Sequence, residues 1–312
     1  MAVIESREAR NMRRNGFLRA LLASILAAWG APATAGPITF NTGLPVHVGE
    51  WIVRQQAIWM KATDDPSPMD RNLNALVAPT VVVYGLNRRV ALFAIEPFVW
   101  KQIEVSTPGG RITRGTTGFG DLTAMTRVTA VAIDRPGETI RLAPFAGLKV
   151  PTGRDDEADG FGRLPQPLQL GSGSWDPLVG TVFTWQTLRW ELDASVSYQR
   201  RTEANDFQAG DEGRGEASFQ YRLVPAGNLG EGVPSYLFAV IESNAVWHGR
   251  DRLAGVPDPD SGGFTWYVAP GLQWVTRRTV LEAAVQVPVV KNTNGLGLRE
   301  DFTGRLSLRV SF

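Results

Sequence analysis

The stretch that decides the fold lies at the C-terminal end: Phe302-Thr303-Gly304-Arg305-Leu306-Ser307-Leu308-Arg309-Val310-Ser311-Phe312. Its side chains alternate between an almost entirely apolar set and a wholly polar set. Because successive side chains of a β-strand point to opposite faces, this pattern predicts a strand with one apolar and one polar surface. The same alternation recurs over residues 190–199, 216–223 and 264–274.

A soluble β-sandwich would show the same alternation, so further features are needed to choose between a sandwich and a membrane barrel. The expected strands reach about 15 residues, well beyond the five or six that are usual in soluble proteins. Nine tryptophans fall near strand ends, as in the aromatic girdles of membrane barrels: Trp51, Trp59, Trp100, Trp175, Trp185, Trp190, Trp247, Trp266 and Trp274.

The connections between the expected strands alternate between short and long, which is how outer-membrane barrels are threaded. The short ones are 86–89, 134–137, 186–189 and 276–279. The long ones are 63–71, 105–118, 151–173, 202–213, 249–263 and 291–299. The link 225–234 is an exception, because it is long but lies on the side where we expect short turns.

These segments predict twelve strands, an even number, as bacterial barrels require. We expect them at 49–61, 71–85, 89–103, 118–132, 138–150, 174–186, 188–201, 214–224, 235–247, 263–275, 279–290 and 300–312. Alternation is weak in the second, third and sixth, which leaves ten or fourteen open. No stretch after residue 36 holds 18 consecutive apolar residues, which excludes helical spans. We therefore expect an all-β fold, a transmembrane antiparallel up-and-down β-barrel over residues 36–312, with an exported β-sandwich as the alternative.

The N-terminal 35 residues predict a secretory signal peptide. A basic head with Arg13, Arg14 and Arg19 precedes an apolar run over 20–29, and Ala33-Thr34-Ala35 supplies the small residues of a cleavage site. Cleavage after Ala35 is expected, Met12 is an alternative start, and a buried N-terminal helix is the alternative interpretation. At the other end, Phe312 resembles the assembly signal of outer-membrane proteins, which predicts the barrel-assembly machinery as a partner.

Composition excludes several classes of protein. With no cysteine, the chain has no disulfide framework, thiolate metal site or cysteine nucleophile. It has two histidines, His47 and His248, which are too few for a polyhistidine metal site. Residues 36–312 carry 27 positive and 29 negative charges, which gives no electrostatic footprint for nucleic acid. We expect neither a metal nor a cofactor.

Three short motifs follow one another in the middle of the chain: Gly118-Phe119-Gly120-Asp121-Leu122, Leu148-Lys149-Val150-Pro151-Thr152-Gly153, and Leu170-Gly171-Ser172-Gly173-Ser174-Trp175-Asp176-Pro177. In this order and spacing they resemble the outer-membrane family called "MetA-pathway of phenol degradation", whose members are often described as transporters. The resemblance covers the middle third by motif and the whole barrel by architecture. It implies an outer-membrane channel for aromatic or other apolar compounds, without fixing a substrate.

The motif residues also have a structural interpretation, which we favour over ligand contact. Glycine supplies the bend where the chain re-enters the sheet at the barrel rim, and Pro151 with Gly153 brackets a turn that stops strand pairing. Asp121 and Asp176 begin strands on the polar face, where they can bond rim backbone or arginines of the lumen. The rim set is Gly118, Gly120, Asp121, Pro151, Gly153, Gly171, Gly173 and Asp176.

If the apolar faces contact lipid, the polar faces line the lumen. The candidate pore-lining residues are Glu96, Arg127, Arg141, Lys149, Glu191, Asp193, Glu216, Arg222, Glu242, Glu282, Arg305 and Arg309. Acids and bases balance, which predicts a lumen without strong selectivity for one sign of charge. Either these charges pair and fill the lumen, or they line a narrow passage with apolar patches at Phe98, Phe145, Tyr236 and Tyr267.

Catalysis and metal binding are weakly supported. His248 follows Trp247 at an expected rim, where a lipid hydrolase would need it, but no matching serine motif is present. The acidic run over 155–160 lacks the spacing of a calcium loop.

We therefore expect a channel of the Gram-negative outer membrane that passes small apolar or aromatic solutes by passive diffusion. A closed structural or surface-interaction barrel and a lipid-modifying enzyme are the alternatives. Residues 36–48 look too short for a plug domain.

Overall fold

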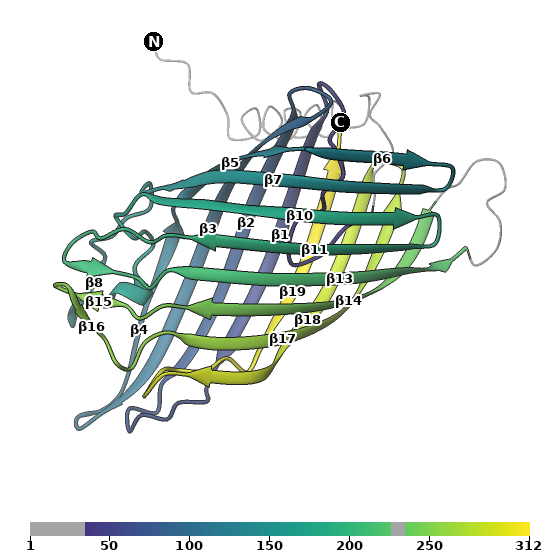
Figure 1. The fold of residues 1–312 in the computed structure, drawn as a ribbon. Coiled ribbons are helices and arrows are strands. Elements are labelled where there is room, and N and C mark those ends of the chain that lie inside the picture. The colour runs from purple at the N-terminus through teal and green to yellow at the C-terminus, as the bar shows by residue number, and fades with distance from the viewer. Residues whose placement is uncertain (1–34, 226–234) are drawn as a thin grey trace, which may run out of the picture.

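The structure, a computed structural model, describes residues 35–225 and 235–312. The proposed signal peptide falls almost wholly on residues outside these ranges. The barrel wall runs around the molecule in Figure 1. Its strands are β1 (Trp51–Ala62), β2 (Asn72–Gly85), β3 (Val90–Thr107), β4 (Gly110–Phe119), β5 (Leu122–Val128), β6 (Val131–Arg135), β7 (Glu138–Val150), β10 (Asp176–Thr187), β11 (Trp190–Gln199), β13 (Glu212–Val224), β14 (Ser235–His248), β17 (Gly263–Thr276), β18 (Thr279–Thr293) and β19 (Phe302–Ser311).

The sheet closes on itself. β1 pairs antiparallel with β19, from Ile52 opposite Ser311 to Lys61 opposite Phe302, so the first and last strands of the wall are joined. β4 and β5 both pair with β3, and β5 and β6 both pair with β7, so these three segments form one interrupted strand. The closed antiparallel barrel of twelve strands is thereby confirmed.

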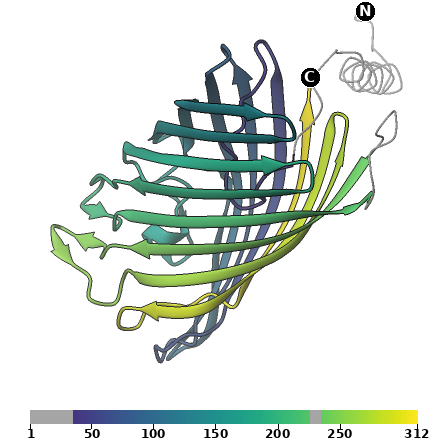
Figure 2. The same ribbon diagram turned by 45° about the vertical axis from the view of Figure 1, so that its right-hand side comes forward.

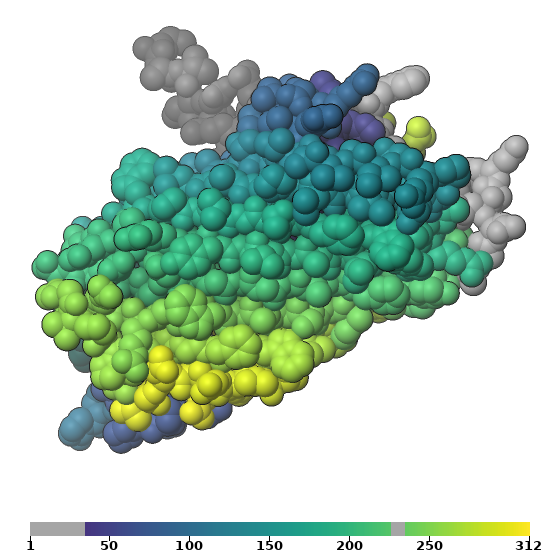
Figure 3. Space-filling model, viewed as in Figure 1, coloured from purple at the N-terminus to yellow at the C-terminus, as the bar shows by residue number. Residues whose placement is uncertain are grey.

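Closure and side-chain alternation separate two environments. In β19, Leu306 and Leu308 are 54% and 45% exposed, whereas Ser307 between them is 1% exposed. Large apolar side chains of β11, β13 and β17 likewise cover the outer surface, which forms a continuous wall in Figure 3. Because the wall has no free edge, the backbone hydrogen bonds of its strands are satisfied within the protein, as hydrocarbon requires.

The two ends of the barrel differ. One end, which we call the turn end, carries the short links at 86–89, 136–137, 188–189 and 277–278. The opposite loop end carries the longer connections, with the small strands β8 (Ala158–Asp159), β9 (Gly162–Arg163), β12 (Phe207–Gln208), β15 (Arg252–Leu253) and β16 (Val256–Pro257) and the 3-10 helix η1 (Gln166–Leu168). Among the described residues no helix is long and apolar enough to span a membrane.

One expected loop is a strand hairpin. We expected a polar connection over 105–118, but β3 continues to Thr107 and β4 starts at Gly110, so the two strands project together at the loop end. Both faces of this projection are partly exposed. Without a contrast between a lipid-facing and a lumen-facing side, no apolar alternation marks these residues as a strand.

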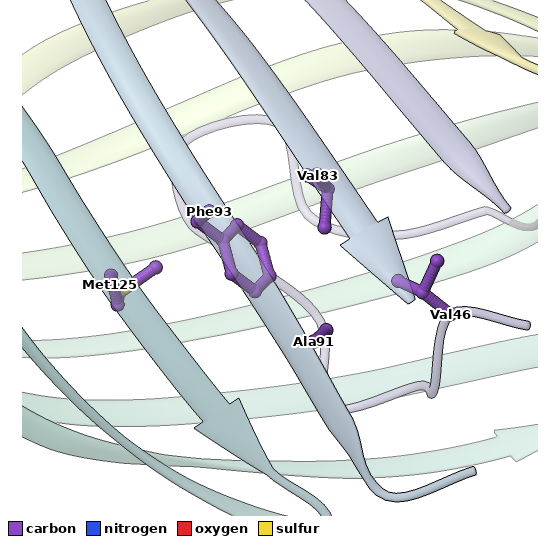
Figure 4. Packing of buried hydrophobic residues seen from close by; sticks show 5 residues of the cluster. All are labelled: Val46, Val83, Ala91, Phe93 and Met125. Atoms are coloured by element: carbon purple, nitrogen blue, oxygen red, sulfur yellow. The ribbon is translucent and has the colours of Figure 1, made fainter. Parts of the chain in front are cut away.

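Residues 35–48, which we call the N-terminal loop, lie inside the barrel (Figure 2). Ala35 packs against Val275 and Val280 near the turn end, and Ile38 is fully buried deeper in the lumen. Val46 returns to the turn end, where it packs against Val83, Ala91, Phe93 and Met125 of the wall (Figure 4). Contrary to our expectation, this short segment occupies the lumen, because it folds as an inserted hairpin and needs no domain of its own.

Candidate functional site

The tip of the N-terminal loop is bound by a carboxylate of the wall. Glu242, midway along β14, accepts hydrogen bonds from the backbone N–H of Ile38 at 2.6 Å and of Thr39 at 3.0 Å. Arg54 of β1 donates to the carbonyl oxygen of Ile38 at 2.7 Å. Polar groups of two separate wall strands, β14 and β1, therefore replace the strand pairing that this segment lacks, as buried backbone groups require.

The returning arm of the loop is held by Arg127 of β5. Its guanidinium donates to the carbonyl oxygens of Thr42 and of Leu44, the latter at 2.5 Å, and lies 5.1 Å from the ring centre of Phe93. Arg127 is 4% exposed, and no carboxylate of the described residues forms an ion pair with it. This buried positive charge thus bonds to carbonyl dipoles and lies against an aromatic face, while the Asp193 carboxylate attracts it through space without touching it.

Two adjacent acids lie on the far side of this arm. Glu191 and Asp193, both on β11, are at most 1% exposed. Gln186 donates to Glu191, and Gln220 donates to Asp193 at 3.1 Å. Thr184 donates to Asp193, and Thr42 of the N-terminal loop donates to Glu191 at 3.4 Å.

A short ion pair of the lumen joins β1 to β18. Arg54 Nη2 lies 2.5 Å from Glu282 Oε2, and the Glu282 side chain is fully buried. Gln273 donates to the other oxygen of Glu282 at 3.1 Å, and Arg54 Nε donates to Ser307 at 2.9 Å. This network fills the lumen beside the N-terminal loop.

A cavity of about 60 Å³ remains between the N-terminal loop and the wall. Phe40, Thr42 and Leu44 border it on the loop side. The wall contributes an apolar surface and three arginines, namely Ile52, Val81, Val83, Phe93, Arg54, Arg127 and Arg309. A second space, too tight to hold a water molecule, shares Arg127 and continues along Pro45 and Val46 to Asn87 and Arg89 at the turn end.

The three sequence motifs meet at the loop end in one cluster, which we call the rim cluster. Asp121 accepts hydrogen bonds from the backbone N–H of Gly153 at 3.0 Å and of Ser172 at 2.9 Å. Lys149 Nζ lies 3.1 Å from Asp121 and 2.7 Å from Asp176. The cluster therefore ties the starts of β5 and β10 to the end of β7.

The glycines of these motifs are needed for close backbone approach. A Cβ at Gly171 would lie 2.3 Å from the carbonyl oxygen of Gly153, and one at Gly153 would lie 2.9 Å from Gly171 Cα. Gly173 has a φ of 71°, which favours glycine. The motifs thus specify a packed crossing of two backbone segments at the rim.

The connection between β7 and β10 packs over the rim cluster. Leu164, Leu168 and Gln169 are at most 3% exposed, and Lys101 of β3 donates to the carbonyl oxygens of Pro167 and Gln169, each at 3.1 Å. This connection is therefore fixed to β3 at the loop end.

We predict that Asp121→Ala loosens this connection. Because the substitution leaves the buried Lys149 with one carboxylate fewer, cleavage by trypsin after Arg163 in the folded barrel should accelerate at least about tenfold. Asp156→Ala, which removes an exposed acid from the same connection, is the control and should leave the cleavage rate unchanged. Equal rates in both variants would show that the rim cluster does not hold the connection.

Two acids in connections at the loop end differ in their bonding and in the direction in which their pKa is shifted. Burial opposes ionisation of Asp65, but hydrogen bonds from Arg71 and Ser67 outweigh it and hold the pKa of the carboxyl well below its usual range. In the connection between β14 and β17, burial raises the pKa of Asp251. The first acid is locked in an ion pair 2.7 Å long, whereas the second binds the backbone N–H of Gly210.

The structure places eleven of the twelve candidate charges on the inner face of the wall. Glu96 is the exception and corrects our prediction. Glu96 lies opposite Thr80 of β2, and Thr80 lies opposite Gln55 of β1. On the same face of β3 as Glu96, Phe98 is 40% exposed and Leu92 is 38% exposed on the outer surface. Phe98, which we expected in an inner apolar patch, therefore also faces outward.

The inner eleven are not one continuous lining. Arg127 and Arg309 border the cavity, Glu191, Asp193, Glu242 and Glu282 bind the N-terminal loop or its neighbours, and Lys149 belongs to the rim cluster. Arg141 pairs with Asp134, Arg222 lies over the Tyr236 ring, Glu216 lies 3.9 Å from Arg214, and Arg305 donates to Gln286. Sequence reasoning missed Arg54 and the N-terminal loop itself.

His248 and the acidic run take ordinary structural partners. His248 Nδ1 lies 3.6 Å from Glu212. In the acidic run, Asp159 pairs with Arg114 at 2.8 Å and Asp155 accepts a hydrogen bond from Asn205 at 2.6 Å. Within the described ranges, no group of three metal-ligating side chains has the arrangement of a metal site.

A closed twelve-stranded barrel with an apolar outer face and a polar, charged lumen is the architecture of bacterial outer-membrane proteins. Residues 70–293 match the model of the family described as "Putative MetA-pathway of phenol degradation". The chain belongs to that family, and the resemblance inferred from the three motifs is confirmed.

Similar solved structures include an outer-membrane channel from Pseudomonas putida F1, with 16% identity, a TM-score of 0.66, and coverage of 86% of this chain and 98% of that one. The translocator domain of the autotransporter NalP from Neisseria meningitidis follows, with 11% identity, a TM-score of 0.45, and coverage of 98% and 97%. The CymD monoaromatic hydrocarbon channel has 10% identity, a TM-score of 0.39, and coverage of 86% and 89%. The first likeness establishes the fold, and no curated protein matches the chain.

Proposed function

We propose that this protein is a passive channel of the Gram-negative outer membrane for small apolar or aromatic solutes. The single observation that carries the proposal is the cavity beside the N-terminal loop, in which an apolar wall with Phe93 lies beside polar groups. The family description adds phenol degradation as a context, which favours aromatic solutes. The named activity of the Pseudomonas putida F1 relative is also that of a channel.

The proposed path has three sections. At the loop end, the connection between β7 and β10 covers the opening and selects solutes by size. In the middle, the solute passes beside the N-terminal loop through the cavity of about 60 Å³, and the adjoining space toward the turn end is tighter still. Since this space is smaller than an aromatic ring, the loop must shift during passage, and solutes move only down their concentration gradient.

Location and partners are part of the proposal. Exposed apolar side chains such as Leu306 and Leu308 contact outer-membrane lipids, and residues 1–35 direct export. Phe312, whose backbone N–H donates to the carbonyl oxygen of Trp51 at 2.8 Å, ends the strand that the barrel-assembly machinery would recognise.

A closed structural barrel is the second candidate, because the N-terminal loop already fills much of the lumen with Ile38 and Phe40, at most 8% exposed. We propose no enzymatic role. His248→Ala should leave the lipid composition of the outer membrane unchanged, and a changed lipid profile would point to a lipid-modifying enzyme instead.

The test is permeation through the purified full chain. Liposomes that contain the protein should swell in isosmotic benzoate and phenol faster than protein-free liposomes, and planar bilayers should show discrete current steps. Failure of every solute and ion to pass would overturn the channel and favour the closed barrel. A size-matched control barrel with a filled lumen would account for leakage at the protein–lipid boundary.

A further inference from the structure

We infer that the route beside the N-terminal loop binds and selects small organic carboxylates with an apolar body, and that Arg127 is the group that recognises the carboxylate. This inference rests on the proposed channel function and names its substrate class. It departs from the expectation of a charge-balanced lumen, because the charges are not distributed evenly along the route.

The charges that line the route are all positive. Arg54, Arg127 and Arg309 border the cavity, and Arg89 borders the adjoining hollow at the turn end. Among the described residues that line either space, none is acidic. An anion that moves along this path therefore meets guanidinium groups in succession, whereas a cation meets no carboxylate.

The acids of the lumen are bound to groups other than Arg127. Glu282 is paired with Arg54, and Glu242 is held by two backbone N–H groups of the N-terminal loop. Glu191 accepts a hydrogen bond from Gln186 and Asp193 accepts one from Thr184. Asp193 attracts Arg127 through space, but within the described residues no carboxylate is in ion-pair contact with its guanidinium, which keeps its positive charge.

The geometry at Arg127 fits a carboxylate. Its two terminal nitrogens donate to two separate carbonyl oxygens, those of Thr42 and Leu44. A carboxylate offers two oxygens to the same planar fork and accepts charge-assisted bonds, which are stronger than bonds to neutral carbonyls. An entering carboxylate can thus replace both loop carbonyls and release this arm of the N-terminal loop.

The rest of the cavity fits an apolar body. Ile52, Val81, Val83 and Phe93 form one wall beside the guanidinium groups. At about 60 Å³, the space is less than half of the roughly 150 Å³ that holds a benzene molecule in a protein core. A benzoate therefore enters only as the arm moves, which couples recognition at Arg127 to widening of the path.

The experiment measures zero-current potentials of the full-length protein in planar bilayers under gradients of potassium chloride and of potassium benzoate. The unmodified channel should prefer chloride and benzoate over potassium. Removal of one charge about 6 Å from the ion changes permeation about threefold for each sign, even at the dielectric constant of water, so Arg127→Gln should lower the anion-to-cation ratio about tenfold.

Matched variants separate charge from folding. Compared with Arg127→Gln, Arg127→Lys should recover most of the preference for chloride but less of the preference for benzoate, because lysine lacks the planar guanidinium that binds both carboxylate oxygens. Arg89→Gln, at the exposed mouth, should lower the ratio by a smaller factor without touching the N-terminal loop. Arg111→Gln, on the exposed projection of β4, should leave the ratio unchanged.

The outcomes distinguish the two levels of the proposal. A conducting channel that prefers potassium, or one in which Arg127→Gln leaves the ratio unchanged, overturns the carboxylate site while the channel function stands. Absence of any current in the unmodified protein overturns the channel function and the site with it. Should Arg127→Gln fail to fold, as judged by loss of the compact band in unheated gel samples, Arg89→Gln decides the inference alone.

Discussion

A chain that lacks residues 37–46 is expected to conduct about three- to fivefold more current per channel than the unmodified protein, because the cross-section that fills the lumen is removed. The deletion exposes Glu242, Arg127 and Thr184 to water, since each now bonds the N-terminal loop. Hydrated polar groups on the inner wall then keep the path open. Single-channel recording in planar bilayers measures the change directly.

The control for this deletion is Ile38→Ala. That substitution removes apolar volume from the fully buried tip of the loop but keeps its backbone bonds to Glu242 and Arg54. Conductance should then rise far less than in the deletion. If the deletion leaves conductance unchanged while the barrel stays folded, ions do not pass through the lumen beside the N-terminal loop.

Most of the wall was predictable from the sequence because lipid and lumen impose opposite polarity on alternate residues. In β19 every residue from Thr303 to Ser311 obeys that rule, so the side to which each of these side chains points followed from the pattern alone. The rule fails in β3. There the inner face packs against Val46 through Phe93 and Ala91, so both faces carry apolar side chains.

That loss of contrast explains the error at Glu96. An acid in a strand is expected to face a polar lumen. Glu96 instead faces outward, because the residues of β3 that alternate with it pack against the N-terminal loop on the inner face. The position of that loop was itself hidden, since several of its bonds go to distant residues such as Thr184, Glu242 and Gln273, which lie 141, 204 and 237 positions away in the chain. No local pattern encodes such contacts.

One signal in the sequence was nevertheless available. Gly85 ends β2, and a Cβ there would lie 1.9 Å from the carbonyl oxygen of His47. A glycine is thus required at position 85, because the N-terminal loop passes too close for any side chain there. Without the partner segment, a glycine at a strand end indicates only a turn.

The largest loss of stability is expected for Glu282→Leu. The Glu282 side chain is fully buried, and its removal leaves Arg54, whose side chain is 11% exposed, without its carboxylate. Breaking a buried ion pair by removing one partner costs about 3–5 kcal/mol, because the remaining charge stays desolvated. Unfolding in urea from lipid vesicles, followed by tryptophan fluorescence, should show a loss of this size in the free energy of unfolding.

The double variant Arg54→Met with Glu282→Leu tests the cause. If the loss comes from the uncompensated charge, removing both partners should recover most of it, since apolar side chains of similar volume often replace a buried ion pair at little cost. Glu104→Gln, which breaks an exposed pair with Arg111 3.1 Å long, is the control and should cost at most about 1 kcal/mol. A double variant no more stable than Glu282→Leu would mean that Glu282 acts through Gln273 and the packing of β18, and that the charge of Arg54 is compensated by Ser307 and the carbonyl oxygen of Ile38.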